Sequence, residues 1–332
     1  MRRVVVITGG TAGVGRATAR DFAREGAAVA VLARGIDRLD ATVAEIAALG
    51  GTGLGIPTDV AESDQVEAAA ERIEAELGPI DVWINNAMTT VFGPVESMTP
   101  REHARVTDVC YHGYVWGTRA ALARMRPRGR GTIIQVGSAL AYRSIPLQSA
   151  YCGAKAAIRG FTDSLRSELL HDRIAIDVCM VQLPAVNTPQ FTWCENKLDK
   201  MPQPVPPIFE PEIIARALHR ISLAPRREVY LGWSAIQAIL GTELVPGVAD
   251  RYLARRGYAG QLTDETKRDE ATNLFSPVLG DHGARGSFAA RKRDPIAAIA
   301  TRIGAAGVRV VAAAALAGLV VLATRAVGRA LA

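Results

Sequence analysis

A glycine-rich turn between an apolar segment and a helical pattern is the strongest constraint on how this chain folds. Residues 3–8 (RVVVIT) form a short, β-branched apolar run without alternation, which predicts a strand buried on both faces. Residues 9–15 (GGTAGVG) follow, and a helical pattern continues to residue 25. This order is typical of a dinucleotide site, because glycines let the backbone approach a pyrophosphate and a helix start offers unpaired N–H groups. The spacing G-x-x-x-G-x-G differs from the G-x-G-x-x-G fingerprint, so the alternative is an ordinary glycine turn.

Apolar runs and helical patterns alternate over the first 235 residues. Repeated alternation favours a parallel sheet covered by helices, so we predict an α/β, Rossmann-like, doubly wound fold of about seven strands with helices on both faces. The predicted strands are 3–8, 28–32, 53–57, 81–85, 131–136, 174–181 and 227–231. The predicted helices are 14–25, 36–48, 62–77, 100–125, 149–171 and 211–223. Such sheets bind ligands beyond the carboxyl ends of their strands.

Tyr151 and Lys155 lie four residues apart, on one face of the helix predicted over 149–171. An ammonium group beside a phenol favours the phenolate, and a neighbouring opposite charge lowers a pKa by about 1–3 units from the ordinary tyrosine value of about 10. Proton transfer is most efficient when such a group titrates near the working pH. Ser138, on a separate segment, offers a hydroxyl that can hold a carbonyl oxygen beside this phenol.

Several motifs, in this order along residues 1–235, resemble those of the short-chain dehydrogenase/reductase family. They are TGGTAGVG at 8–15, NNA at 85–87, Ser138, Tyr151 with Lys155, and PAVNT at 184–188. The resemblance implies that Tyr151 is the general acid in ketone reduction and the base in alcohol oxidation. It also implies that Lys155 lowers the pKa of Tyr151 and holds the nicotinamide ribose, and that Ser138 donates to the substrate oxygen.

The resemblance also implies where the cofactor lies. Asp59 with Val60 would meet the adenine ring, residues 85–87 would line the adenosine half, and Val186 with Thr188 would touch the nicotinamide amide. The implied cofactor-binding residues are Gly9, Thr11, Gly13, Val14, Gly15, Asp59, Val60, Asn86, Ala87, Tyr151, Lys155, Pro184, Val186 and Thr188.

The end of the second strand bears on the choice between the two nicotinamide cofactors. A carboxylate there would hold the ribose hydroxyl of NAD(H), but this chain has Ala33 followed by Arg34, and Arg16 beside the glycine turn. Guanidinium groups make forked contacts with phosphate oxygens, so Arg16 and Arg34 favour NADP(H) over NAD(H). The alternative is that both arginines are ordinary solvated residues.

Two positions depart from the family. Met88 follows NNA where the family usually has glycine, and Cys110 occupies the place of an asparagine that kinks a helix and anchors a water to the lysine. A thiol is a weak donor and acceptor and replaces a carboxamide poorly, which leaves the backbone carbonyl at this position to hold the water.

Residues 186–210 interrupt the alternation with a proline-rich segment that carries aromatic side chains. We expect a lid over the substrate, and the alternative is a surface loop whose aromatic side chains serve packing. Mostly apolar residues are predicted near the substrate: Met88, Phe92, Tyr142, Ile145, Leu147, Phe191 and Trp193. Without an arginine to clamp an acid, this set favours a ketone, aldehyde or alcohol of apolar character.

The net charge of +6 is concentrated in the C-terminal tail. Residues 285–332 hold eight Arg and Lys against one acid, a charge of +7, which leaves −1 for the 284 residues before them. The enzyme domain is therefore close to neutral, so we expect no nucleic-acid partner. A basic tail suits an anionic membrane surface.

The four cysteines and five histidines show no metal-ligand spacing, so we assign no metal site. Cysteines without a disulfide framework suit the reducing cytoplasm, and no secretory signal precedes the first strand. By resemblance we also expect a homo-oligomer formed through the helices predicted at 100–125 and 149–171.

The predicted organisation is a catalytic domain at 1–260, a polar linker at 261–295 and an alanine-rich helix at 296–332. Residues 310–324 are fifteen uncharged residues, about 22 Å of helix, which is less than a bilayer core of about 30 Å. Extension to 303–324 gives about 33 Å but includes Arg309, whose long side chain can reach toward the interface. Three interpretations stay open: a membrane anchor with the enzyme domain on the cytoplasmic side, a helix on a membrane surface or a partner, and a frayed tail.

The leading hypothesis is an NADP(H)-dependent oxidoreductase that acts on a carbonyl or hydroxyl group of an apolar substrate. A second is a cofactor-binding regulatory or scaffold protein with little turnover, for which Cys110 and Met88 are the only support. A third is a membrane-tethering module that the tail would provide.

Overall fold

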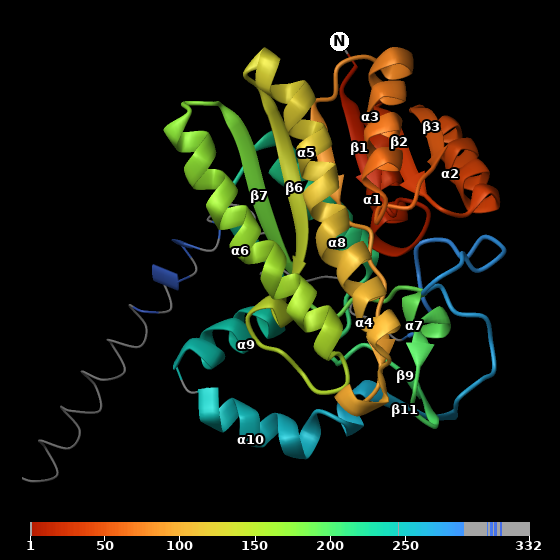
Figure 1. Cartoon of the computed structure of the whole chain (residues 1–332), viewed down its shortest axis with the longest axis vertical. Coiled ribbons are helices and arrows are strands. Elements are labelled where there is room, and N and C mark those ends of the chain that lie inside the picture. Colours follow the sequence, from red (N-terminus) through yellow and green to blue (C-terminus); the bar gives the residue numbers. More distant parts are fainter. Residues whose placement is uncertain are drawn as a thin grey trace, which may run out of the picture.

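The computed structural model describes residues 2–244 and 246–288, together with isolated residues between 304 and 313. Its centre is a seven-stranded parallel sheet with the strand order β10-β7-β6-β4-β1-β2-β3 (Figure 1). The strands are β1 Val4–Thr8, β2 Ala28–Ala33, β3 Thr52–Pro57, β4 Val82–Asn85, β6 Gly131–Ser138, β7 Ile176–Leu183 and β10 Glu228–Tyr230. The predicted α/β doubly wound fold is confirmed, and each predicted strand overlaps one of these seven.

Helices cover both faces of the sheet. They are α1 Gly13–Arg24, α2 Ile36–Ala48, α3 Ser63–Leu77, α4 Pro100–Thr107, α5 Gly113–Met125, α6 Ser149–His171 and α8 Pro211–Leu223. One apolar core joins the sheet to α1, α2 and α8 through residues such as Phe22 and Leu218. A second core joins the other face to α3, α5 and α6 through residues such as Ile73 and Leu165. Because both faces are covered, all five residues of β1 are buried, as its unbroken apolar run predicts.

The helix predicted over 100–125 is interrupted near its middle. A capping box starts α4, with the Thr99 hydroxyl accepting from the backbone N–H of Glu102. A π-helical turn at Asp108–His112 then separates α4 from α5. Cys110 is buried in this turn, and its thiol donates to the backbone carbonyl of Thr89 at 3.1 Å. A π turn inserts an extra residue into a helix and is a common cause of a bend, so this turn lies where the family resemblance implies a kink at asparagine.

Short elements form the predicted lid at 186–210. They are α7 Gln190–Trp193, β8 Glu195–Asn196 and β9 Lys200–Pro202. β8 pairs with β5 (Val91–Phe92), and β9 pairs antiparallel with β11 (Leu262–Thr266). Two further helices, α9 Trp233–Leu244 and α10 Pro246–Arg256, lie between β10 and β11 in the chain. Single 3-10 turns occupy Val95–Ser97, Arg126–Arg128, Ala139–Ala141 and Ala259–Gln261.

Residues 267–288, which we call the strap, follow β11. They pass α7 and return toward the glycine turn between β1 and α1 (blue in Figure 1). The strap lies within the range 261–295 that the sequence analysis describes as a polar linker.

Among the residues that the structure describes, every helix is too short or too polar to cross a bilayer. Most of the predicted helix at 296–332, including most of 303–324, lies outside the described residues.

Candidate active site

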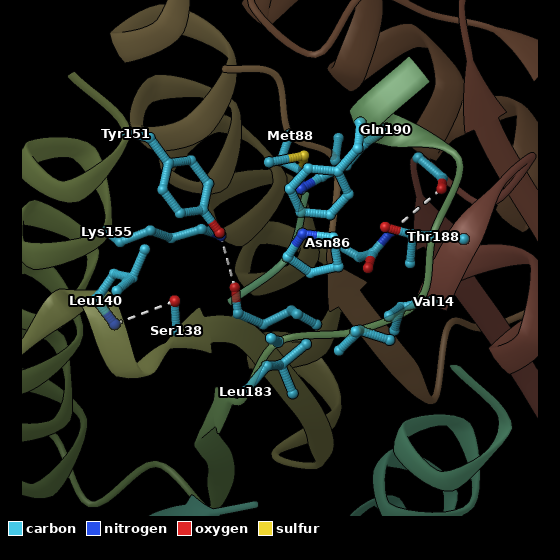
Figure 2. Close-up of a pocket in the computed structure, with 18 of the residues that line it drawn as sticks. Val14, Asn86, Met88, Ser138, Leu140, Tyr151, Lys155, Leu183, Thr188 and Gln190 are labelled. Carbon is cyan, nitrogen blue, oxygen red and sulfur yellow. Dashed lines mark hydrogen bonds between the residues drawn. The ribbon is translucent and has the colours of Figure 1, made fainter. Parts of the chain in front are cut away.

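A cavity of about 430 Å³ opens at the carboxyl ends of the strands, where doubly wound sheets bind ligands. The glycine turn and the ends of β2 and β3 line one part of it, and the end of β6, the start of α6 and the lid line another. Figure 2 shows side chains from several of these segments directed into the same space. The predicted site residues that line the cavity are Gly9, Thr11, Gly13, Val14, Arg34, Asp59, Val60, Asn86, Ala87, Met88, Ser138, Ile145, Tyr151, Lys155, Pro184, Val186, Thr188, Phe191 and Trp193.

Close backbone approach fixes the shape of the glycine turn. Gly9 has a φ of +64°, and a Cβ atom there would lie 2.7 Å from Ala87 Cα. Gly15 does not line the cavity, and a Cβ atom there would lie 2.3 Å from the Gly9 carbonyl oxygen. Asn86 Nδ2 donates to the carbonyl oxygens of Thr8 and Gly9 at 3.0 and 3.2 Å. The predicted role of Gly15 is therefore corrected to close packing of the turn.

The start of α1 presents backbone N–H groups at this turn. No side chain caps the helix at its first residue, Gly13. The Gly13 N–H donates to the Gly283 carbonyl at 3.2 Å, whereas the N–H group of Val14, which lines the cavity, has no acceptor among the described residues. Unpaired N–H groups at a helix start bind anions, so this turn fits the pyrophosphate of the dinucleotide that the fold implies.

Ser138, Tyr151 and Lys155 lie together in the other part of the cavity (Figure 2). Ser138 ends β6, and its hydroxyl oxygen accepts from the Leu140 N–H at 3.1 Å, which fixes its rotamer. Tyr151 and Lys155 lie one turn apart near the start of α6, and Lys155 Nζ is 5.6 Å from the centre of the Tyr151 ring. The strand end and the helix start thus bring a hydroxyl, a phenol and an amine to one place.

Lys155 is only 2% exposed, and groups other than the Tyr151 hydroxyl hold its ammonium. Its Nζ donates to Tyr114 Oη at 2.8 Å and to the Val136 carbonyl at 2.7 Å. Tyr114 Oη in turn donates to the same carbonyl at 2.9 Å. Tyr114 is not among the predicted site residues. In the sequence, only its place in the helical segment after Cys110 connects it with the site.

Burial controls the ionisation of Tyr151. It raises the pKa of the phenol well above its ordinary value, two nearby thiols raise the pKa further, and only the Ser138 hydroxyl opposes the change. In this structure loss of hydration dominates and the Lys155 ammonium donates to other acceptors, so the lowering of this pKa by Lys155 stays a prediction. Tyr151 is therefore held in the protonated form, which is the form that donates a proton.

Burial also acts on Lys155, in the opposite sense for a cationic group. It lowers the pKa of the amine to about 8, and the Cys110 thiol works against this change. The thiol itself has its pKa raised by burial. Cys110 therefore contributes a neutral neighbour to the site and not a nucleophile.

Arg16 does not line the cavity, so its prediction as a phosphate ligand is wrong. Its side chain is 3% exposed and faces α2. Nε lies 2.5 Å from Glu45 Oε2, Nη1 donates to Thr42 Oγ1 at 2.6 Å, and Nη2 lies 3.4 Å from Asp281 Oδ2. Proximity in sequence to the glycine turn gave no information on which face of α1 this residue occupies.

Arg34 and Arg38 both line the cavity, at the end of β2 and in the first turn of α2. We call this part of the cavity the adenosine end, because the family resemblance implies the adenosine there. Arg34 donates to the backbone carbonyls of Asn273 and Leu274. Arg38 is not among the predicted site residues; it lies four residues after Arg34, in the first turn of α2. It is 8% exposed, its guanidinium carbon is 5.2 Å from the centre of the Trp193 ring, and its Nε has no hydrogen-bond partner among the described residues. Burial lowers the pKa of both arginines, so a bound anion would relieve an unfavourable environment.

Asp59 and Val60, predicted near the adenine ring, line the same end of the cavity. One Asp59 oxygen lies 2.5 Å from Arg105 Nη2, and the other accepts from the Ala61 N–H at 3.1 Å. The carboxylate is thus neutralised and held in place.

Two residues predicted near the substrate, Phe92 and Tyr142, do not line the cavity, and this assignment is corrected. Phe92 is fully buried, with its ring centre 5.9 Å from that of Phe191. Tyr142 Oη donates to Glu228 at 2.7 Å, on the side of β10. Leu147 is buried and does not line the cavity either.

Other apolar residues take their place around the catalytic end. They are Leu140, Leu183, Val205, Ala235, Ala238 and Leu253. Arg143 also lines the cavity. Its guanidinium lies 2.5 Å from Asp250, so its charge is already paired.

The described residues hold no group of three or more His, Cys, Asp or Glu side chains placed to bind a metal ion. The four cysteines, Cys110, Cys152, Cys179 and Cys194, are free and buried.

Comparison with known proteins agrees with this geometry. Residues 3–197 match the family model for short chain dehydrogenase. The uncharacterized oxidoreductase YxnA of Bacillus subtilis is 31% identical over 283 residues, which cover 84% of this chain and 80% of that protein. A short chain dehydrogenase of Pseudocercospora fijiensis is 38% identical over 170 residues, 50% of this chain and 55% of that protein.

Solved structures show the same similarity. A short-chain dehydrogenase from Streptomyces avermitilis has a TM-score of 0.63 and 26% identity, covering 77% of this chain and 98% of that chain. An alcohol dehydrogenase from Thermococcus sibiricus, complexed with 5-hydroxy-NADP, has a TM-score of 0.60 and 25% identity, covering 70% of this chain and 96% of that chain.

Proposed function

Because this chain belongs to the short-chain dehydrogenase/reductase family, we propose that it is an NADP(H)-dependent oxidoreductase that interconverts a carbonyl group and an alcohol on an apolar substrate. The observation that carries the proposal is a single cavity lined by Ser138, Tyr151 and Lys155 and also by the glycine turn. The proposed proton donor, Tyr151, and the turn that fits a pyrophosphate therefore line the same cavity.

A bound nicotinamide supplies or accepts the hydride. Ser138, fixed at the end of β6, donates to the substrate oxygen. Tyr151 gives its proton to that oxygen in reduction and takes it back in oxidation. Lys155 holds the nicotinamide ribose and supplies a positive charge near the reacting groups.

The preference for NADP(H) rests on Arg34 and Arg38. The end of β2 offers Ala33 in place of a carboxylate, and Asp59 is already paired with Arg105. Arg38 offers a buried guanidinium with an unpartnered Nε at the adenosine end. A phosphate on the adenosine ribose is the anion that suits two guanidinium groups at this place.

The apolar character of the substrate follows from the side chains at the catalytic end. Met88, Ile145 and Leu253 are typical of them, and the Arg143 charge is paired with Asp250. Pockets of this composition orient a ligand through few polar groups, here the catalytic hydroxyls.

The test is NADPH oxidation by the full chain over a panel of lipid-like, steroid-like and terpenoid ketones and aldehydes. We expect turnover with at least one, and a loss of about 100-fold or more in kcat for Tyr151→Phe with NADPH affinity unchanged. Tyr142→Phe is the matched control, because that phenol lies outside the cavity. NADPH binding without turnover on any substrate would favour the alternative of a regulatory or scaffold protein.

We also propose that the chain forms a homo-oligomer through the faces of α5 and α6. Tyr111, Trp116 and Phe161 are partly exposed aromatic side chains beside or on these helices. Light scattering coupled to size-exclusion chromatography would give a monomer mass if this proposal is wrong.

A further inference from the structure

The strap, residues 267–288, lies against the glycine turn, the adenosine end of the cavity and the lid. We propose that it forms the outer wall of the cofactor cleft and limits the rate at which the dinucleotide leaves. The proposal rests on the proposed function, since it concerns release of the cofactor from that same site. It assigns a role to a segment beyond residues 3–197, the part of the chain that the family model matches.

At the adenosine end, Asn273 of the strap lines the cavity, and Leu274 follows it in the chain. Leu274 is fully buried in the core below α3, and its carbonyl accepts from Arg105 Nε at 3.0 Å and from Arg34 Nη1 at 3.4 Å. Asn273 lines the cavity and is hydrogen-bonded through its side chain to Thr89 at 3.3 Å. Arg34, which lines the cavity, and Arg105, which pairs with Asp59, are thus both held by backbone of the strap.

At the glycine turn, the strap makes a second set of contacts. The Gly283 carbonyl accepts from the Gly13 N–H at 3.2 Å, and Asp281 lies 3.4 Å from Arg16. Ala284 is 2% exposed and packs with Ala17 of α1 and a residue of α8. This contact is on the helix side of the strap, away from the cavity lining.

Near the nicotinamide end, the strap contacts the segment that follows β7. The Gly286 N–H donates to the Asn187 carbonyl at 3.2 Å, and the Phe288 N–H donates to Asn187 Oδ1 at 3.1 Å. Thr188, which lines the cavity, is so close to Gly286 that a Cβ atom there would lie 2.5 Å from the Thr188 carbonyl oxygen.

The strap is also joined to the lid. The Asn273 N–H donates to the Trp193 carbonyl at 2.8 Å, and the rings of Trp193 and His282 meet edge to face at 4.7 Å. β9 of the lid pairs with β11, from which the strap starts. Lid and strap are therefore joined by a hydrogen bond, a ring contact and a strand pair, so movement of one disturbs the contacts of the other.

These contacts close the cleft without filling it. The cavity is still lined by Val14 and Lys155 with the strap in place. At the start of α1, the strap takes the N–H group of Gly13 and leaves that of Val14, which lines the cavity, for an anion. The geometry is that of a cover that retains a bound dinucleotide, and a cover of this kind makes opening the slow step of release.

The experiment measures NADPH release from the full chain by stopped-flow fluorescence, with excess NADP⁺ as the competitor. Gly286→Ala lifts the strap by a clash with the Thr188 backbone, and Ala284→Leu lifts it independently by overfilling its contact with α1. Gly260→Ala is the matched control, because the added methyl meets only one atom, at 4.0 Å. We expect release to be at least about tenfold faster in both variants and unchanged in the control.

Circular dichroism of each variant verifies the fold, and a variant that fails to fold is replaced by the other. Wild-type binding with unchanged release rates in a folded variant overturns the strap proposal and leaves the proposed function intact. Tighter NADPH binding in the variants also overturns it, since the strap would then exclude the cofactor. If the wild type binds no nicotinamide dinucleotide at all, the proposed function fails and the strap proposal fails with it.

Discussion

Lys155 Nζ lies 2.8 Å from Tyr114 Oη, and both groups share the carbonyl oxygen of Val136. A buried ammonium requires acceptors, and this phenol supplies one from a neighbouring helix. Tyr114 is thus a positioning residue for Lys155, in a family whose usual asparagine is replaced here by Cys110. The helical segment still contains a π turn at that position.

Tyr114→Phe should lower kcat by about tenfold while the KM for NADPH changes less than about twofold, because it removes one hydrogen bond from the ammonium. A hydrogen bond to a charged group favours the charged form, so its loss lowers the pKa of Lys155 further. The alkaline side of the pH–rate profile should therefore move to lower pH. Tyr111→Phe, a partly exposed tyrosine of the same segment, is the control. A fall in kcat with an unmoved profile would leave Tyr114 a packing residue only.

Lys155→Met tests the cost of the buried amine. Burial lowers the pKa of Lys155 from an ordinary 10.5 to about 8, so between these two pH values the unfolded chain holds more protons than the native one. The free energy of unfolding of the wild type therefore increases as the pH rises from about 8 to 10.5. Below pH 8, the full destabilisation by the buried ammonium is present. Near pH 7 the inactive methionine variant should be more stable by about 1–3 kcal/mol.

Urea denaturation of both proteins from pH 7 to 9.5 measures this difference. Buried tyrosines and cysteines also titrate at alkaline pH, but they are common to both proteins, so the difference between the two curves isolates Lys155. The advantage of Lys155→Met should shrink as the pH rises above 8. A constant difference over the whole range would show that the amine is not desolvated as the structure indicates.

Sequence patterns predicted the parts of this protein that depend on local chemistry. β1 and the glycine turn follow from an apolar run and from residues that permit close backbone approach, and Tyr151 with Lys155 follows from helical spacing. Contacts between side chains from segments far apart in the sequence could not be predicted in this way. Tyr114 meets Lys155 across 41 positions of the chain.

The arginines show the same limit. In the sequence, Arg16 follows the glycine turn and Arg38 follows the end of β2. The direction of each side chain decides which of them reaches the cavity. Arg16 faces Glu45 on α2, and Arg38 faces the cavity beneath Trp193. The position of the strap could be predicted even less, because its polar, glycine-containing sequence resembles that of a linker. Only its tertiary contacts determine where it lies.

Arg38→Ala should lower the preference for NADPH over NADH, as a ratio of kcat/KM, by about tenfold or more, since it removes a guanidinium from the proposed phosphate site. Activity with NADH should change little. Arg16→Ala is the contrasting variant: it should cost about 1.5–3 kcal/mol of stability through lost hydrogen bonds to Glu45 and Thr42, with the cofactor ratio unchanged. The opposite pattern would restore Arg16 as the phosphate ligand.

The four cysteines should be inert in the native protein. Each is buried, and burial raises the pKa of each thiol, to about 12 for Cys179 and Cys194. Since the thiolate is the reactive form, an aromatic disulfide reagent at pH 8 should label no thiol on a timescale of minutes and should label four after denaturation. Cys152 decides the outcome, because it adjoins Tyr151 and its labelling would disturb the start of α6. Rapid reaction of one thiol, with loss of activity that NADPH prevents, would show that the start of α6 opens to solvent and would contradict the buried environment on which the raised pKa of Tyr151 depends.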